Sequence, residues 1–139
     1  MDRPRGFTLF ELVIVTAIVA ILAMLAVASY RRYAYRAHRT DAKHVLMTIA
    51  HGEERWYATY NRYTDDLGKF GYADPAVSPH GYYAVELAVA STNAQAYVAT
   101  ATPINSQAGD VCGNLSIDNA GNRVPDRTDE VANANGSCW

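Results

Sequence analysis

The sequence predicts an α+β fold in which one long N-terminal helix packs on a small antiparallel β-sheet. Three observations favour this fold. The apolar run Leu12–Tyr30 carries no charge. Apolar residues with helical spacing continue to Tyr60, and short segments of alternating apolar and polar residues follow them. A chain of 139 residues has room for one such domain rather than two.

The first part of the helix is long enough to cross a membrane. Positions 7–28 comprise 22 residues, which span about 33 Å as an α-helix. A secretory signal peptide has a shorter core, about 7–15 residues, and a small-residue cleavage site. The length therefore favours a transmembrane helix. Four arginines follow the apolar run and two precede it, and this count taken alone favours a cytoplasmic C-terminus.

A carboxylate, Glu11, lies inside this apolar segment. An isolated charge there costs at least about 2.5 kcal/mol on insertion scales, so it needs a partner or a task unless it lies near enough to the interface to be hydrated. The residues before it form a distinctive pattern. Arg3 and Arg5 precede Gly6, and the segment that starts at Phe7 reads FTLFEL.

This pattern resembles the type III signal of type IV pilins and of type II secretion pseudopilins. The resemblance implies that a prepilin peptidase removes residues 1–6 by cutting after Gly6 and methylates the new N-terminus at Phe7. It also implies that Glu11, the fifth residue of the mature chain, meets the amine of Phe7 on a neighbouring subunit and sets the axial register. In a low dielectric, a close pair of opposite charges offsets much of the penalty that each charge carries alone.

The same resemblance implies a cytoplasmic leader and an exported head, against the arginine count. The arginines that follow the apolar run then lie just outside the bilayer: Arg31, Arg32, Arg36 and Arg39. They are expected on a solvated or lipid-headgroup face, or in pairs with acidic surfaces of neighbouring subunits. Exposed ion pairs contribute little, which favours the solvated face.

The helix is predicted to continue to about Tyr60, because no proline occurs between Ala37 and Tyr60. Apolar residues at spacings of three and four mark one buried face: Ala42, Val45, Leu46, Ile49, Trp56, Tyr57 and Tyr60. Gly52 weakens the middle of this helix slightly. His44 and His51 share a face, but such scattered ligands give only weak support for a metal site.

Strands are predicted after a loop. Residues 61–81 read as the loop because they contain five glycines and prolines. Alternation predicts a strand at 82–90, whose apolar face consists of Tyr83, Val85, Leu87 and Val89. Further strands are predicted at 96–102, 114–118 and 122–124. Short turns between sequential strands imply antiparallel pairing, and one apolar face of the sheet is expected to cover the helix.

Two cysteines, Cys112 and Cys138, lie near the C-terminus with 25 residues between them. A chain that crosses a membrane early places them in an oxidising compartment, where such a pair usually forms a disulfide. Closing a loop of that size is worth about 3 kcal/mol in the chain-entropy model. Two unrelated buried thiols are the alternative. Neither cysteine belongs to a CxxC motif, so a redox or zinc role has little support.

The resemblance extends along the chain. The segments RTDAKHVLMTIAHGEERWYATYNRYT, GYYAVEL, AYVATATP and CGNLSIDNAGNR are similar to PilE-like minor pilins, in which the helix packs on an antiparallel sheet and the C-terminal cysteines close a D-region loop. This implies a transmembrane and assembly helix at 7–30, an amphipathic helix at 31–60, and a head at 61–139 that contains an αβ-loop, the sheet and the D-region. Ala28 departs from the pattern, because many pilins have a helix-interrupting proline there.

Charge and motifs limit the functions that the head can have. Positions 40–139 hold six basic and twelve acidic residues, a formal charge of −6. Such a surface repels phosphate backbones, so nucleic-acid binding by direct head contact is not expected unless basic residues cluster in space. The chain has no catalytic or nucleotide-binding motif, so neither an enzyme nor a cofactor is predicted. Asp126, Asp129 and Glu130 are candidate calcium ligands, but they lack an EF-hand pattern and a solvated acidic loop is the simpler interpretation.

These features predict a minor pilin, a structural subunit of a type IV pilus used for twitching motility, adhesion or DNA uptake. Its expected partners are major and minor pilins, the prepilin peptidase and an inner-membrane assembly platform. It is expected in the inner membrane with its head in the periplasm, and later in the surface pilus. The alternatives are a pseudopilin of a type II secretion system and a binding module displayed on the fibre.

Overall fold

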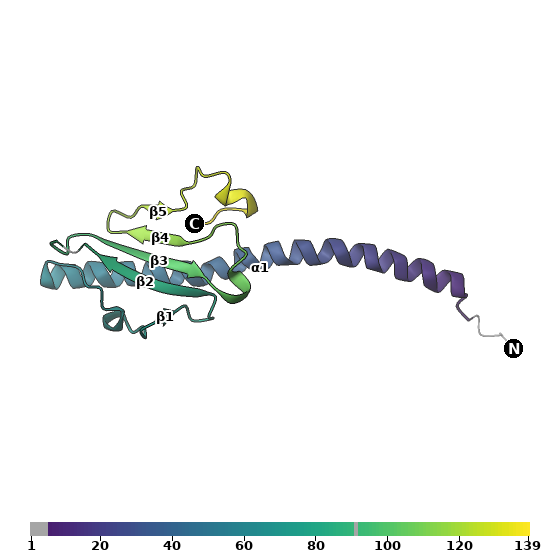
Figure 1. The fold of residues 1–139 in the computed structure, drawn as a ribbon, viewed down its shortest axis with the longest axis horizontal. Coiled ribbons are helices and arrows are strands. Elements are labelled where there is room, and N and C mark those ends of the chain that lie inside the picture. Colours follow the sequence, from purple (N-terminus) through teal and green to yellow (C-terminus); the bar gives the residue numbers. More distant parts are fainter. Residues whose placement is uncertain (1–5, 91) are drawn as a thin grey trace. The chain divides into compact units, whose positions relative to one another are not determined.

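The computed structural model describes residues 6–90 and 92–139 (Figure 1). These residues form two compact units, of which the first ends at Ala34 and the second runs from Tyr35 to Trp139. Helix α1 (Leu9–Tyr60, 52 residues) contributes to both units. The predicted leader falls mostly on residues 1–5, which lie outside the described residues.

The predicted length of α1 is confirmed. The helix begins one residue after Thr8 and ends at Tyr60, as the absence of proline between Ala37 and Tyr60 predicts. It continues through Ala28, the position where the resemblance leads one to expect a proline. An alanine there keeps both the backbone N–H and a high helix propensity.

The second unit contains one antiparallel sheet, which runs beside the C-terminal part of α1 (Figure 1). Its strand order is β1-β2-β3-β4-β5, and the strands are β1 (Ala76–Val77), β2 (Tyr83–Val89), β3 (Tyr97–Pro103), β4 (Leu115–Asp118) and β5 (Arg123–Val124). The four predicted strands are confirmed to within one residue at each end. The two-residue β1 was missed, because it is too short to show alternation and lies in the segment rich in glycine and proline.

The core of the head contains predicted residues of the helix and of the first long strand, although Leu87 and Val89 are only partly buried. From α1, the side chains of Val45, Leu46 and Ile49 are fully buried. They meet buried residues of three strands, which are Tyr83, Val85, Tyr97, Ala99, Ala101, Leu115 and Ile117. The prediction that Tyr60 belongs to this face is wrong, because its side chain is 53% exposed. Tyr60 packs on Trp56 instead, with ring centroids 4.1 Å apart.

The αβ-loop, which we define as residues 61–75, folds back on α1. It contains the 3-10 helix η1 (Leu67–Phe70), which is capped by the Asp66 carboxylate through the N–H of Gly68. A Cβ on Gly52 would lie 2.5 Å from the ring of Phe70. Gly52 therefore has a packing function that its helix propensity hides, since only glycine lets the loop approach the helix this closely.

Candidate functional site

The N-terminal segment places the predicted processing and assembly residues at the start of α1. The N–H of Glu11 donates to Thr8 Oγ1 at 3.2 Å, the first half of a capping box in which Thr8 and Glu11 have the required spacing. Gly6 and Phe7 precede the helix, and Phe7 is 83% exposed. Within the described residues, the Glu11 carboxylate has no hydrogen bond or ion pair.

The apolar part of α1 lacks internal packing. Every residue from Gly6 to Tyr33 is exposed. Among the described residues, α1 is the one helix long and apolar enough to cross a membrane, with a mean hydropathy of 2.8 over its most apolar stretch. An apolar surface of this length is stable only in lipid or against other apolar helices.

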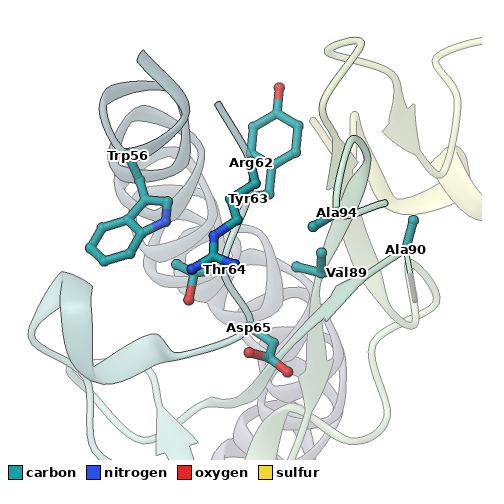
Figure 2. A pocket seen from close by; sticks show the side chains of 8 residues that line it. All are labelled: Trp56, Arg62, Tyr63, Thr64, Asp65, Val89, Ala90 and Ala94. Atoms are coloured by element: carbon teal, nitrogen blue, oxygen red, sulfur yellow. The ribbon is translucent and has the colours of Figure 1, made fainter. Parts of the chain in front are cut away.

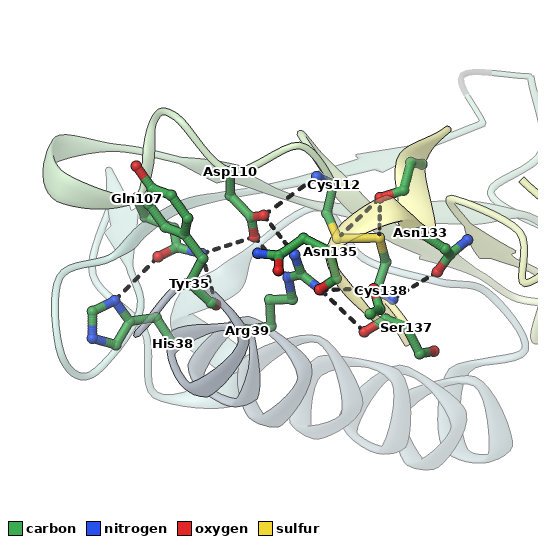
Figure 3. A network of polar contacts seen from close by, with 12 residues as sticks. Tyr35, His38, Arg39, Gln107, Asp110, Cys112, Asn133, Asn135, Ser137 and Cys138 are labelled. Carbon is green, nitrogen blue, oxygen red and sulfur yellow. Dashed lines mark hydrogen bonds and ion pairs between the residues drawn. A yellow bond between two sulfur atoms is a disulfide. The ribbon is translucent and has the colours of Figure 1, made fainter. Parts of the chain in front are cut away.

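Arg39 links the helix to two distant parts of the head (Figure 3). Its Nε donates to Asp110 Oδ2 at 2.7 Å, and its Nη2 donates to Asp110 Oδ1 at 2.6 Å. Its Nη1 donates to three consecutive carbonyls near the C-terminus, those of Asn135, Gly136 and Ser137. Both charged side chains are almost wholly buried, at 1% and 0% exposure.

The expectation that Arg39 lies on a solvated or intersubunit face is wrong, because its side chain is buried inside the head. Its position follows from the helical spacing, because residues 39, 42, 46 and 49 lie three and four apart on one stripe. The guanidinium donates to a buried carboxylate and to three carbonyls near the C-terminus, and hydrogen bonds from a charged donor are the stronger kind.

Gln107 extends the same network (Figure 3). Its amide nitrogen lies within hydrogen-bond distance of the Tyr35 carbonyl, the Tyr83 hydroxyl and Asp110 Oδ2. The Gln107 amide oxygen lies 3.1 Å from His38 Nδ1. Because an amide oxygen can only accept a hydrogen bond, His38 Nδ1 is the donor and carries the proton. Burial is the main cause that raises the pKa of Tyr83 to about 12, which keeps its hydroxyl neutral.

The predicted disulfide is confirmed, since Cys112 and Cys138 are bonded. Both residues are buried. The N–H of Cys138 donates to Asn133 Oδ1 at 2.8 Å, and Asn133 Nδ2 donates to the carbonyls of Asp126 and Asp129. The bridge and these bonds fix the last part of the chain beside β4, where Arg39 reaches it.

The candidate calcium ligands are used in local turns. Asp126 Oδ1 accepts from the N–H and hydroxyl of Thr128, and Asp129 Oδ1 accepts from the N–H of Ala132. His44 and His51 are exposed. In the part of the chain that the structure describes, no group of three or more His, Cys, Asp or Glu side chains is placed to hold a metal ion.

A basic cluster occurs on the acidic head. Burial lowers the pKa of Lys43, and the positive charges of Arg39, Arg123 and Arg127 lower it further. Arg123 and Arg127 therefore each lie near Lys43, although they are up to 84 residues away from it in sequence. The guanidinium of Arg123 lies 5.3 Å from the ring centroid of Trp139. An arginine over a tryptophan ring is a cation–π pair of the kind common in folded proteins.

Comparisons with known proteins agree with this architecture. Residues 28–116 match the family model described as "Type IV minor pilin ComP, DNA uptake sequence receptor", and residues 1–27 match the prokaryotic N-terminal methylation motif. The chain belongs to the type IV minor pilin family. A solved type IV pilin from Shewanella oneidensis is similar, with 30% identity and a TM-score of 0.56 over 76% of this chain and 97% of that chain. No curated protein matches the chain significantly.

Membership of the family explains why the chain combines an exposed apolar helix with a polar head. This minor pilin is a subunit of a type IV pilus, and its exposed apolar helix fits a protein that is anchored in a membrane before it enters the fibre. Family membership indicates a structural role rather than catalysis. The sequence reasoning did not identify Arg39, Asp110 and Gln107 as a network, because contacts over 69 to 72 residues leave no local signal.

Proposed function

We propose that this minor pilin is cut after Gly6, methylated at Phe7 and built into the pilus through a contact between Glu11 and the Phe7 amine of a neighbouring subunit. Its head is in the periplasm before assembly and on the pilus surface afterwards. The observation that carries the proposal is the Glu11 carboxylate, which lies in the exposed apolar part of α1 and has no partner among the described residues. A charge in that environment requires a counter-charge from outside the chain.

Incorporation of Glu11→Val into sheared pili tests the assembly contact. Membrane insertion is expected to be unchanged or improved, because a charge is removed from the apolar segment, whereas the amount of the subunit in pili is expected to fall strongly. Glu130→Val is the matched control, since Glu130 is an exposed carboxylate of the head. Normal amounts of Glu11→Val in purified pili would disprove the contact.

The processing step has a separate test. The intact mass of the mature protein is expected to correspond to a chain that starts at methylated Phe7. A mature chain with any other N-terminus would contradict the assignment of Gly6 and Phe7, whatever the outcome of the Glu11 experiment.

A second function is favoured by the basic cluster. The matching family model is named for a DNA uptake sequence receptor. Arg123 and Arg127 lie near Lys43, and Arg123 lies over the ring of Trp139. The formal charge of −6 on positions 40–139 predicts weak binding, but phosphate contacts depend on local charge as well as on the total. We therefore propose that this cluster contacts DNA.

DNA affinity measured as a function of salt concentration distinguishes binding by the basic cluster from the weak binding that the net charge predicts. If the cluster binds phosphates, Arg123→Ala and Arg127→Ala each weaken binding and lower the salt slope by about one. Lys69→Ala is the control, because Lys69 pairs with Asp66 at 3.5 Å in the αβ-loop. Equal effects of all three substitutions, or no measurable DNA binding, would support the expectation drawn from net charge.

A further inference from the structure

A carboxylate without a full set of partners is buried where the αβ-loop meets α1. Glu53 is 0% exposed. Its Oε2 accepts the N–H of Thr64, a residue of the αβ-loop, at 3.1 Å. Its Oε1 is also buried and has no hydrogen-bond partner among the described residues, and the same holds for the indole Nε1 of Trp56, one turn further along α1. Buried polar atoms are rarely left in this state without a functional reason.

Tyr63 fixes the start of the αβ-loop in the core, and further contacts hold the loop beside this carboxylate. The Tyr63 hydroxyl donates to Glu54 Oε1 at 3.2 Å, the ring of Phe70 lies over Gly52, and Lys69 Nζ lies 5.9 Å from the Trp56 ring. A hollow of about 330 Å³ opens between Trp56, Thr64 and the end of β2, as Figure 2 shows. Apart from Tyr63, every residue of the αβ-loop is exposed or only partly buried, and a surface segment of this kind opens before the core does.

The charges that face Glu53 oppose its ionisation. Burial is the main cause that raises the pKa of Glu53 to about 7, the Thr64 N–H lowers it in part, and the negative charges of Glu54 and Asp65 raise it further. From the loop and from β3, Tyr63 and Tyr97 also face this charge, which contributes to the raised pKa of both phenols. No cation is among the groups that shift the pKa of Glu53.

We propose that Glu53 is a proton-linked latch, which holds the αβ-loop on α1 when the carboxyl is neutral and releases the loop when the carboxyl ionises. The Thr64 N–H donates to an oxygen that remains an acceptor in both forms, so protonation keeps this bond and removes the buried charge. Opening uncovers Trp56 and the hollow beside it. The latch is independent of the proposed DNA contact, which uses other residues.

The sign and size of the pH effect follow from linkage. The docked loop holds a proton on Glu53 up to about pH 7, whereas a solvated glutamate loses it near 4.5. The stability that the neutral carboxyl gives to the docked loop is thus complete below pH 4.5 and is lost as the pH rises through 7. With these two values, the opening equilibrium increases about twentyfold between pH 5.5 and 7.5.

Limited trypsin cleavage of the full-length protein in detergent tests the latch. Arg62 and Lys69 are exposed residues of the αβ-loop, and exposed Arg127 lies outside it. The rate of cleavage after Lys69, divided by the rate after Arg127 in the same digest, removes the pH dependence of trypsin itself. This ratio is expected to rise about twentyfold from pH 5.5 to 7.5, because cleavage follows the open population when opening is fast.

Two variants assign the effect to one carboxyl. Glu53→Gln stays neutral, so its ratio is expected to be independent of pH, while Glu54→Gln is expected to keep most of the rise. A flat ratio in the unmodified protein, or the same rise in Glu53→Gln, would overturn the proposal. If Glu53→Gln fails to fold, carbon-13 NMR of glutamate carboxyls in the unmodified protein decides. One carboxyl is expected to titrate near pH 7, and titration of all of them near 4.5 would refute the latch.

Discussion

Replacement of Arg39 by methionine is expected to destabilise the head more than any exposed charge change. The substitution keeps the length and packing of the side chain but removes its donors. Asp110, whose side chain is 0% exposed, is then left as a buried charge with hydrogen bonds from Gln107 Nε2 at 2.9 Å and from the N–H of Cys112 at 3.5 Å. Breaking one partner of a buried pair in this way costs about 3–5 kcal/mol.

Thermal unfolding of the full-length protein in detergent, followed by circular dichroism, measures this cost. A domain of roughly 100 residues loses about 4–8 °C in Tm for each kcal/mol, so Arg39→Met is expected to lower Tm by at least about 12 °C. Lys69→Met is the control. Lys69 Nζ lies 3.5 Å from Asp66 Oδ2, and both side chains are about half-exposed. Such a surface pair contributes less than about 1 kcal/mol to stability.

A double variant that also removes the Asp110 carboxylate tests whether the buried charge causes the loss of stability. If the cost arises from an uncompensated charge, Arg39→Met combined with Asp110→Leu is expected to be more stable than Arg39→Met alone, because the orphaned carboxylate is gone. Additive losses in the double variant, or a fall in Tm of less than about 4 °C in Arg39→Met, would show that the pair is not the origin of the stability.

The disulfide and the packing of Phe70 on Gly52 can each be tested by a substitution. Cys112→Ser is expected to lower the free energy of unfolding by about 3 kcal/mol, and reduction of the unmodified protein is expected to lower its free energy of unfolding by the same amount; no effect of reductant would contradict this. Gly52→Ala is expected to cost about 1–3 kcal/mol by overpacking against Phe70. Gly52→Ala with Phe70→Leu is expected to recover part of that loss in urea unfolding, and an equal loss in both variants would exclude the steric explanation.

The elements of the fold could be predicted because each one leaves a local pattern. Helical spacing identified Val45, Leu46 and Ile49, and alternation identified Tyr83 and Val85. In each case neighbours in sequence share a face, so a short window contains the signal. The two-residue strands β1 and β5 lie at the limit of this method. Strand β5 corresponds to the short segment predicted at 122–124.

The polar contacts of the head could not be predicted, for a physical reason. A charged residue on an apolar stripe has two explanations, an exposed edge or an internal partner, and only the fold decides between them. Arg39 and Glu53 both lie on the stripe that continues through Leu46. Arg39 finds Asp110 at a separation of 71 residues, whereas Glu53 keeps one oxygen without a partner. The same ambiguity applied to net charge, because −6 over the head does not exclude a local cluster around Lys43.

The residues expected to affect assembly differ from those expected to affect the stability of the head, because their polar groups differ in whether they have partners within the chain. In the first unit, the Glu11 carboxylate has no partner within the described residues, so its replacement is expected to affect contacts with other subunits without unfolding the head. In the second unit, Arg39, Gln107 and Asp110 are fully engaged with one another and with the backbone, so their replacement is expected to unfold the head before it affects assembly. A variant of Glu11 that lowered the Tm of the head would contradict this separation.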